Sequence, residues 1–328
     1  MVMENNDILK VKKYLTDNEV KGIYSLVFNK NNNIKINRLT GGLKNSVYLI
    51  ENNEEKVVLK VASANNDKTL SIDRNTMWWE AEILKKLESI DIPSPKLLYS
   101  DNSCSICPYP FIFMTYIDGK NYFDVKKEMS DLEIKKIEYE IGVISKKITS
   151  IVGKNFFIPA YKNKKINNNY EFMFALFQSL FNDSCLINLK LERIRYSSIF
   201  KIIESFKKEI NDVDKISLCH ADLWDGNILI KNKTISGVLD YSDLYYGDEL
   251  FTFYFRNTEK TVNKNFLNGY GKTSLTYSEN IRVHIYKLYT ILKMIIDVAY
   301  KGYGRYQWMY DDLEKNYQKI IKIKRNML

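Results

Sequence analysis

Residues 216–249 read ISLCHADLWDGNILIKNKTISGVLDYSDLYYGDE, and this stretch decides the fold. Short apolar pieces rich in β-branched residues alternate here with polar turns. The pattern predicts a strand that leads into a polar loop at 222–226, followed by a hairpin that turns at Asn232 and Lys233. The polar groups of the loop therefore stand between apolar anchors, at the ends of strands.

Three oxygen-bearing side chains lie at these predicted strand ends: Asp222 after the first strand, Asn227 at the start of the second, and Asp240 at the end of the third. They can converge although they are spread along the sequence. Convergent carboxylate and amide oxygens suit Mg²⁺. Phosphoryl transfer needs one further carboxylate that orients a hydroxyl and accepts its proton. Each Asp alone is equally typical of a turn that caps a strand, whereas the joint spacing favours this chemistry.

The His-x-Asp-x-x-x-x-Asn spacing that begins at His220, followed by the strand-terminal Asp240, resembles the catalytic and metal-binding segments of the protein-kinase-like superfamily. Its small-molecule branch includes the aminoglycoside phosphotransferases, choline kinases and fructosamine kinases, and typically has glycine where this chain has Ala221. The Leu-Trp pair at 223–224 and Tyr-Tyr-Gly-Asp at 245–248 are most similar to the fructosamine kinases and their bacterial relatives. His220 is expected to brace the loop by hydrogen bonds rather than to transfer protons.

The resemblance implies an α+β, two-lobed protein-kinase-like fold, with a small antiparallel-sheet N-terminal lobe at 1–117 and a larger, mostly helical C-terminal lobe at 118–328. It implies ATP and Mg²⁺ as cofactors, and transfer of the γ-phosphate to a hydroxyl of a small polar molecule. In this reading Asp222 is the catalytic base or orienting group, and Asn227 and Asp240 hold Mg²⁺.

A glycine-bearing turn separates short segments of period-two hydrophobicity, which predicts a small antiparallel sheet. Gly41 and Gly42 would let the backbone approach a phosphate, and Asn45 or Ser46 would add a side-chain donor. A plain hairpin turn is the alternative. The phosphate loop is favoured because a strand that presents Lys60 follows at the spacing of the resembled superfamily.

A helix predicted over 76–87 supplies a partner for that lysine. Glu80 shares one helical stripe with Met77 and Leu84, so it lies in the apolar face. Lys60 likewise lies among apolar neighbours, where a lone ammonium would lose its hydration. We therefore predict an ion pair between Lys60 and Glu80, which matches the superfamily pair whose lysine contacts the α- and β-phosphates. The alternative is that Glu80 reaches into water from the edge of the stripe.

The buried strand predicted over 111–117 resembles the hinge that joins the two lobes and binds adenine. Main-chain groups bind the edge of the base in such a hinge. The carbonyl of Thr115 and the amide of Ile117 are therefore expected to serve, with Met114 behind the ring. An ordinary core strand is the alternative.

Most of the remaining chain is predicted to be helical. Ser130 and Glu133 form a capping box that begins one helix. Further helices are expected over 170–181, 186–210 and 288–300, and from Tyr310 onward. Lys293 and Asp297 interrupt the most apolar of them.

The composition, with 45% hydrophobic and 27% charged residues, is that of a globular protein, and no window has the unbroken apolar length of a membrane span. The net charge is +9, but the lysines are spread along the chain, so no nucleic-acid partner is expected. The first residues lack an export signal. Only Cys104 and Cys107 lie close together, which makes no disulfide framework. We expect a cytoplasmic protein without a membrane partner.

Three acceptor classes stay open: aminoglycosides, ketoamines such as fructosamines, and choline-type amino alcohols. The acidic residues near the expected cleft could bind a cationic amine or could simply cap helices; they are Asp243, Asp248, Glu249, Asp311 and Asp312. A kinase-like protein that only binds ligands is a rival from another class. The right residue types at all five chemical positions argue against that rival.

Overall fold

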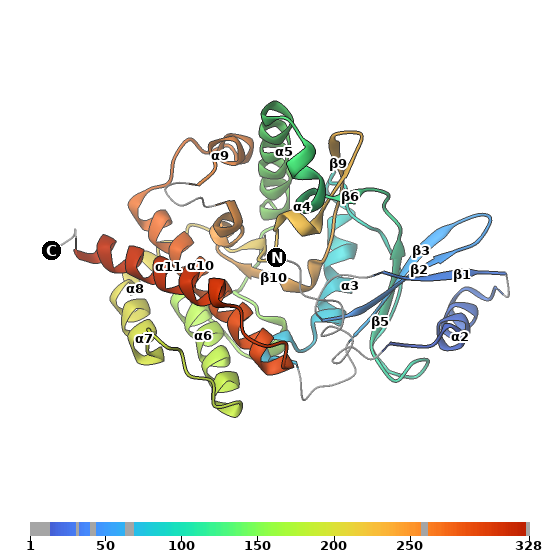
Figure 1. Ribbon diagram of the computed structural model, residues 1–328, viewed down its shortest axis with the longest axis horizontal. Coiled ribbons are helices and arrows are strands. Elements are labelled where there is room, and N and C mark those ends of the chain that lie inside the picture. The colour runs from blue at the N-terminus through green and yellow to red at the C-terminus, as the bar shows by residue number, and fades with distance from the viewer. Residues whose placement is uncertain (1–13, 31–32, 40–43, 63–68, 257–261, 326–328) are drawn as a thin grey trace.

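The computed structural model describes residues 14–30, 33–39, 44–62, 69–256 and 262–325. Its N-terminal part is built on one antiparallel sheet with the strand order β1-β2-β3-β5-β4. The strands are β1 (Lys35–Leu39), β2 (Ser46–Glu51), β3 (Lys56–Val61), β4 (Leu97–Asp101) and β5 (Phe111–Thr115). Figure 1 shows this sheet at one end of the molecule and most of the helices at the other.

Two helices, α2 (Asp17–Phe28) and α3 (Thr76–Leu87), cover opposite faces of the sheet. Side chains alternate along a strand, so Phe113 of β5 packs in the apolar cluster of α2 and its neighbour Ile112 in that of α3. Lys60 of β3 lies opposite Ile112 in the ladder. Its side chain therefore points to the α3 side.

The C-terminal part carries two small antiparallel ladders. In one, β7 (Ser217–His220) pairs with β10 (Leu244–Gly247); in the other, β8 (Ile228–Lys231) lies between β6 (Lys120–Asn121) and β9 (Thr234–Val238). Asn232 and Lys233 join β8 to β9, and their φ angles of 51° and 63° are the left-handed values that a type I′ hairpin turn requires. The hairpin predicted at these residues is confirmed.

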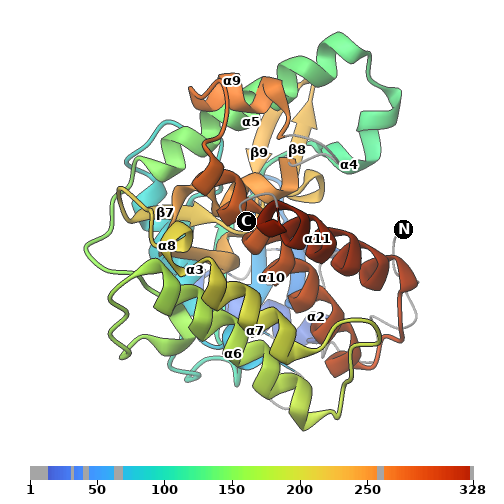
Figure 2. The same ribbon diagram turned by 90° about the vertical axis from the view of Figure 1, so that its left-hand side faces the viewer.

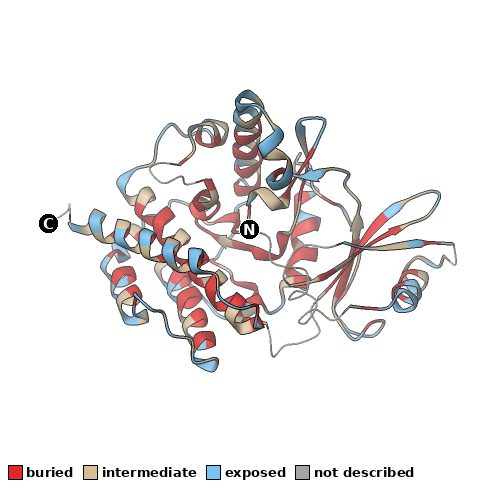
Figure 3. Cartoon of the chain, viewed as in Figure 1, coloured by how far each residue is buried: buried red, intermediate tan, exposed pale blue. Residues whose placement is uncertain are grey.

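Helices form the rest of the C-terminal part, and several of them pack on the long α10 (Figure 2). They are α4 (Tyr122–Val125), α5 (Asp131–Thr149), α6 (Asn169–Leu186), α7 (Tyr196–Ser205), α8 (Lys207–Ile210), α9 (Lys264–Tyr270), α10 (Tyr277–Lys301) and α11 (Gln307–Arg325). Figure 3 shows that α10 is buried along much of its length. Helices α5 and α9 approach so closely that a methyl group on Gly142 would lie 2.2 Å from the carbonyl oxygen of Phe266.

The predicted fold class is confirmed, because a small antiparallel sheet with two helices joins a larger, mostly helical part. The helix predicted over 76–87 has the predicted bounds, and the Ser130 capping box begins α5. The division of the chain after residue 117 stays a prediction. Within the described ranges, no helix is both long and apolar enough to cross a membrane.

Two expectations about element bounds are wrong. The strand predicted over 111–117 ends at Thr115. The segment 186–210 is not one helix, because α6 ends at Leu186 and α7 begins only at Tyr196. Asn188 has a left-handed φ of 52°, which an α-helix cannot contain.

Candidate active site

Lys60 binds two acidic residues from opposite parts of the chain. Its ammonium lies 2.9 and 2.7 Å from the two carboxylate oxygens of Glu80 on α3, and 2.9 Å from Oδ1 of Asp240, which follows β9. Glu80 also accepts a hydrogen bond from the amide of Tyr241. The ion pair predicted from the helix stripe is confirmed, and Asp240 joins it. We call Lys60, Glu80 and Asp240 the β3 triad.

Burial and charge compete within the β3 triad, where Lys60 is 6% and Glu80 1% exposed. Burial alone would lower the pKa of Lys60, but the charges of Asp240 and Glu80 together outweigh it and raise that pKa. Burial raises the pKa of Glu80 in spite of Lys60. Burial also opposes the charge on Asp240, yet the charge and hydrogen bond of Lys60 lower its pKa to about 2. Lys60 and Asp240 are therefore ionised at neutral pH.

Asp240 and Asn227 each keep an oxygen that could hold a metal ion. Oδ1 of Asp240 accepts hydrogen bonds from Lys60 and Ser242, whereas Oδ2 accepts none from a described residue. The amide nitrogen of Asn227 donates to Asp222, which leaves its oxygen available. These donors fit Mg²⁺, which takes one or two protein ligands together with substrate phosphates. Within the described ranges, no three His, Cys, Asp or Glu side chains group closely enough to hold a metal by themselves.

The backbone of Asp240 is left-handed, with a φ of 61°. Aspartate and asparagine are the residues besides glycine that adopt this conformation most readily. In this conformation the Asp240 carboxylate lies 2.9 Å from the Lys60 ammonium.

Asp222 lies in the loop between β7 and β8, which His220 braces from behind. The Asp222 amide donates to Nδ1 of His220 at 3.2 Å, and Nε2 of His220 lies 3.3 Å from the carbonyl oxygen of Leu239. Because Nδ1 accepts, the proton of the neutral ring sits on Nε2 and is donated to Leu239. Burial lowers the pKa of His220 to about 4. The ring is thus neutral at pH 7, and the predicted bracing role is confirmed.

The Asp222 carboxylate is suited to act as a base. Oδ2 accepts a hydrogen bond of 3.0 Å from the Asn227 amide, which fixes its orientation. Burial, together with the negative charges of Asp243 and Asp240, raises its pKa well above the usual value. A carboxylate with a raised pKa binds a proton more strongly, which favours general-base work.

Three side chains of one 3₁₀ segment, η7 (Glu249–Arg256), hold the backbone of this loop. The hydroxyl groups of Thr252 and Tyr254 and the guanidinium of Arg256 donate to the carbonyl oxygens of residues 220, 221 and 223, at 2.9, 2.8 and 3.0 Å. This support was not predicted from the sequence, because residues 249–256, ELFTFYFR, have the composition of an aromatic core. No local periodicity gives the signal, because residues two apart point in different directions on a 3₁₀ helix, where side chains three apart are the ones that align.

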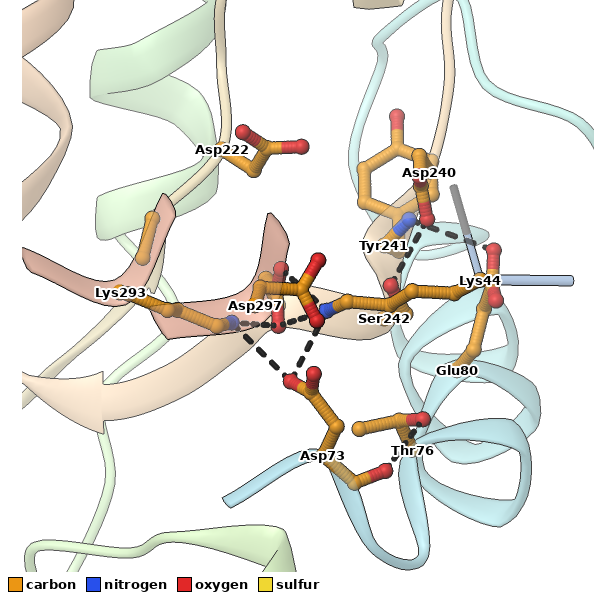
Figure 4. A network of polar contacts seen from close by, with 12 residues as sticks. Lys44, Asp73, Thr76, Glu80, Asp222, Asp240, Tyr241, Ser242, Lys293 and Asp297 are labelled. Atoms are coloured by element: carbon orange, nitrogen blue, oxygen red, sulfur yellow. Dashed lines mark hydrogen bonds and ion pairs between the residues drawn. The ribbon is translucent and has the colours of Figure 1, made fainter. Parts of the chain in front are cut away.

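A second cluster of charges lies beside the β3 triad. Lys44 lies 2.9 Å from both Asp73 and Asp243, and Lys293 lies 3.0 Å from Asp73 and 2.9 Å from Asp243 (Figure 4). We call these four residues the double-lysine cluster. Burial opposes every one of these charges, but the opposite charges prevail, so the pKa values of both lysines are raised and those of both aspartates lowered.

The glycine-bearing turn is only partly visible. Gly41 and Gly42 lie outside the described residues. Ser46 begins β2 opposite Val61, which packs in the cluster of α2, so its side chain lies on the face of the sheet away from Lys60. The expected side-chain contact from Ser46 to a phosphate therefore lacks geometric support, because strand alternation turns it to the other face. Asn45 stays a prediction.

The hinge segment packs against the β8–β9 hairpin. A methyl group on Gly237 would lie 2.9 Å from the side chain of Ile117, so glycine makes room for the hinge there. The Ser236 hydroxyl donates to the Asp118 carbonyl at 2.8 Å. Met114 and Thr115 are partly exposed at the end of β5. The adenine contacts expected of this segment stay a prediction.

The acidic residues considered for a cationic acceptor all have basic neighbours. Asp243 belongs to the double-lysine cluster; Asp248 lies 2.7 Å from Arg282, Glu249 3.1 Å from Lys215, Asp311 3.6 Å from Arg193 and Asp312 3.2 Å from Lys287. Each of these acids is thus paired in this structure, and a cationic acceptor stays a prediction.

A cavity of about 390 Å³ opens beside the loop that carries Asp222. Phe123 and Trp224, which are 45% and 40% exposed, form aromatic walls with ring centroids 5.7 Å apart. Asp225, also on the wall, lies 2.8 Å from Lys126 and 2.6 Å from Arg256. The cavity thus offers aromatic faces together with charges that are already paired.

Solved structures of similar fold are phosphotransferases by name. A streptomycin–ATP complex of APH(2″)-IIa has a TM-score of 0.60 and 17% identity, over 94% of this chain and 97% of that one. A candidate fructosamine-3-kinase from Haemophilus somnus 129PT has a TM-score of 0.66 and 18% identity, over 92% and 96%. A candidate aminoglycoside phosphotransferase from Ralstonia eutropha JMP134 has a TM-score of 0.65 and 12% identity, over 94% and 99%.

A family profile gives the assignment that these structures, at such low identity, cannot give. Comparison with curated proteins found no match. The profile of the phosphotransferase enzyme family matches residues 35–255, which is more than half of the chain and includes Asp222 and the whole β3 triad. The chain therefore belongs to the phosphotransferase enzyme family.

Proposed function

We propose that this protein transfers the γ-phosphate of ATP to a hydroxyl group of a small polar molecule. The observation that carries the proposal is the convergence of Asp222, Asn227 and Asp240 beside the paired Lys60. Similar structures give further support, since they include complexes of APH(2″)-IIa with ATP, of APH(2″)-Ib with ADP and of APH(4)-Ia with AMP-PNP. A cytoplasmic location fits the use of ATP.

The contacts support each proposed role. The Asp222 carboxylate, held by Asn227, orients the acceptor hydroxyl and takes its proton. The free oxygens of Asn227 and Asp240 hold Mg²⁺, which, when bound, neutralises charge on the phosphates. Lys60, fixed by Glu80, binds the α- and β-phosphates. His220 holds the loop and does not titrate near neutral pH.

The nucleotide base is proposed to bind at the hinge. Main-chain groups of Thr115 and Ile117 bond the adenine edge, and Met114 packs on the ring. We take 1–117 and 118–328 as the two lobes on either side of that hinge. The Gly41-Gly42 turn and Asn45 are proposed to close over the phosphates.

The acceptor is proposed to bind in the aromatic cavity beside Asp222. Trp224 and Phe123 would pack against a ring or chain of the acceptor. Because the acids near the site are paired, the structure gives no preference to a strongly cationic acceptor. Ketoamines are the second candidate class besides aminoglycosides, and the similarity to a candidate fructosamine-3-kinase favours testing them early.

Replacement of Asp222 by Asn tests the proposal. We expect turnover on any accepted hydroxyl compound to fall by about 10²–10⁴-fold, with nucleotide affinity nearly unchanged because Asp222 acts on the acceptor. Release of ADP over a panel of aminoglycosides, ketoamines, amino alcohols and sugars measures turnover, and calorimetry measures nucleotide affinity. Asp91→Asn, an exposed acid paired with Lys147, is the matched control. Full activity of Asp222→Asn would remove this residue from the mechanism.

A further inference from the structure

Lys44 follows the glycine-bearing turn in the sequence and binds two aspartates that lie far from it along the chain. It lies just before β2, after the undescribed residues 40–43. Its ammonium nevertheless lies 2.9 Å from both Asp73, which precedes α3, and Asp243, which follows Asp240 by three residues. Figure 4 shows its side chain extended toward Asp73 and Lys293. Lys44 is thus a cation beside the proposed phosphate site, held there by two aspartates.

The position of Asp243 shows where the Lys44 ammonium lies relative to Asp222 and Asp240. The carbonyl oxygen of Asp243 accepts a hydrogen bond from the amide of Ala221, the residue before Asp222. A phosphoryl group in transfer lies in line between the acceptor hydroxyl, which Asp222 would orient, and the leaving oxygen of the β-phosphate, whose charge Mg²⁺ held by Asn227 and Asp240 would neutralise. The Lys44 ammonium, bound to the Asp243 side chain, therefore lies next to the segment that carries Asp222 and next to the one that carries Asp240.

The two lysines of the cluster are not equivalent. Both bind Asp73 and Asp243, but the Lys293 side chain is 12% exposed and comes from the buried helix α10, whereas that of Lys44 is 22% exposed and comes from a turn. If Lys44 leaves, Lys293 still neutralises one charge of the two aspartates. Lys44 is therefore the cation that can be exchanged at the lower cost.

We propose that Lys44 is a phosphate-binding side chain, which moves from Asp73 and Asp243 to the terminal phosphates when Mg·ATP binds, while Lys293 stays with the two aspartates. The proposal rests on the proposed function. A charge-assisted hydrogen bond to phosphate replaces one to carboxylate, so the exchange keeps the ammonium paired throughout. Mg·ATP carries a net negative charge, which the Lys44 ammonium would bind.

The decisive variant is Lys44→Met, measured by calorimetry with three ligands. We expect affinity for Mg·AMP-PNP to fall about tenfold or more, affinity for Mg·ADP to fall less, and affinity for adenosine to stay the same. Unchanged adenosine binding reports an intact fold. Lys44→Arg should keep most of the affinity. Lys85→Met is the matched control, because Lys85 is an exposed lysine paired with Glu82 on the outer side of α3.

Asp73→Asn gives an independent readout, because it removes one of the two partners that compete with the phosphates for Lys44. Mg·AMP-PNP affinity should then rise a few-fold. Unchanged or weaker binding would contradict the exchange, as would a Lys44→Met variant that binds Mg·AMP-PNP as tightly as the wild type. If the wild type itself does not bind Mg·AMP-PNP, the proposed function falls as well; if it binds and only the variants fail to respond, the role of Lys44 alone is wrong.

Discussion

The β3 triad and the double-lysine cluster lie side by side and differ in their balance of charge. The triad holds two carboxylates on one lysine, whereas the cluster holds two carboxylates on two lysines. The triad therefore keeps a surplus negative charge on Asp240, where a divalent cation is proposed to bind. The cluster is complete without a metal. Asp240 and Asp243, three residues apart, thus belong to groups of different net charge, and only the β3 triad has charge left for the proposed metal.

The largest effect should come from breaking the triad. Lys60→Met leaves the buried carboxylate of Glu80 and the partly exposed one of Asp240 without a cation, and should lower the free energy of unfolding by about 3–5 kcal/mol. Glu80→Gln should cost less, because Lys60 keeps Asp240. The double variant should cost less than the sum of the single ones, and turnover should follow the same pattern. Urea unfolding and steady-state kinetics measure both; strict additivity would mean that the two residues do not act together.

In the double-lysine cluster, the two single substitutions should add up to less than the double one, which is the reverse of the expectation for the β3 triad. Lys44→Met or Lys293→Met alone leaves two aspartates on one lysine, which is the arrangement that the triad already tolerates, so each should cost only about 1–2 kcal/mol. The double variant leaves both aspartates buried without a cation and should cost more than the sum. If the double variant cost no more than the sum, the two lysines would not substitute for each other.

The smallest expected effect is on the pH dependence of stability, which should differ between the β3 triad and the double-lysine cluster in acid. The pKa of Asp243 is below its usual 3.8, so this residue stabilises the fold at higher pH and loses that contribution as the pH falls below 3.8. The pKa of Glu80 is above its usual 4.5, so its ionisation costs stability at higher pH, and that cost disappears on acidification. As the pH falls from 6 to 3, the free energy of unfolding should decline less steeply in Asp243→Asn than in the wild type. In Glu80→Gln it should decline more steeply. Equal slopes would contradict the difference.

The sequence predicted those parts of the site that rest on local pattern. Glu80 stands out because it occupies an apolar helix stripe, and Asp222, Asn227 and Asp240 stand out by their spacing. The β8–β9 turn is predictable because Asn232 belongs to the few residue types that accept a left-handed backbone at low cost. In each case one short segment contains the whole signal.

The double-lysine cluster could not be predicted in the same way, because its members come from four separate segments. Lys44 and Asp243 are 199 residues apart in the chain. Lys293 was visible only as a charge that interrupts an apolar helix, which indicates a buried partner without naming it. Ser46 shows the converse error: its sequence position beside the glycines suggested a phosphate contact, but the phase of β2 turns it to the other face.

The way α3 joins the two halves bears on whether they can exist apart. A fragment that ends at 117 would keep Lys60 and Glu80 but lose Asp240 and the Tyr241 amide. It would also lose the carbonyl oxygen of Leu244, to which the Trp79 ring donates at 2.6 Å. A fragment that starts at 118 would keep Asp240 without its lysine. Each half supplies partners for the buried polar groups of the other, so we expect neither fragment to fold stably alone.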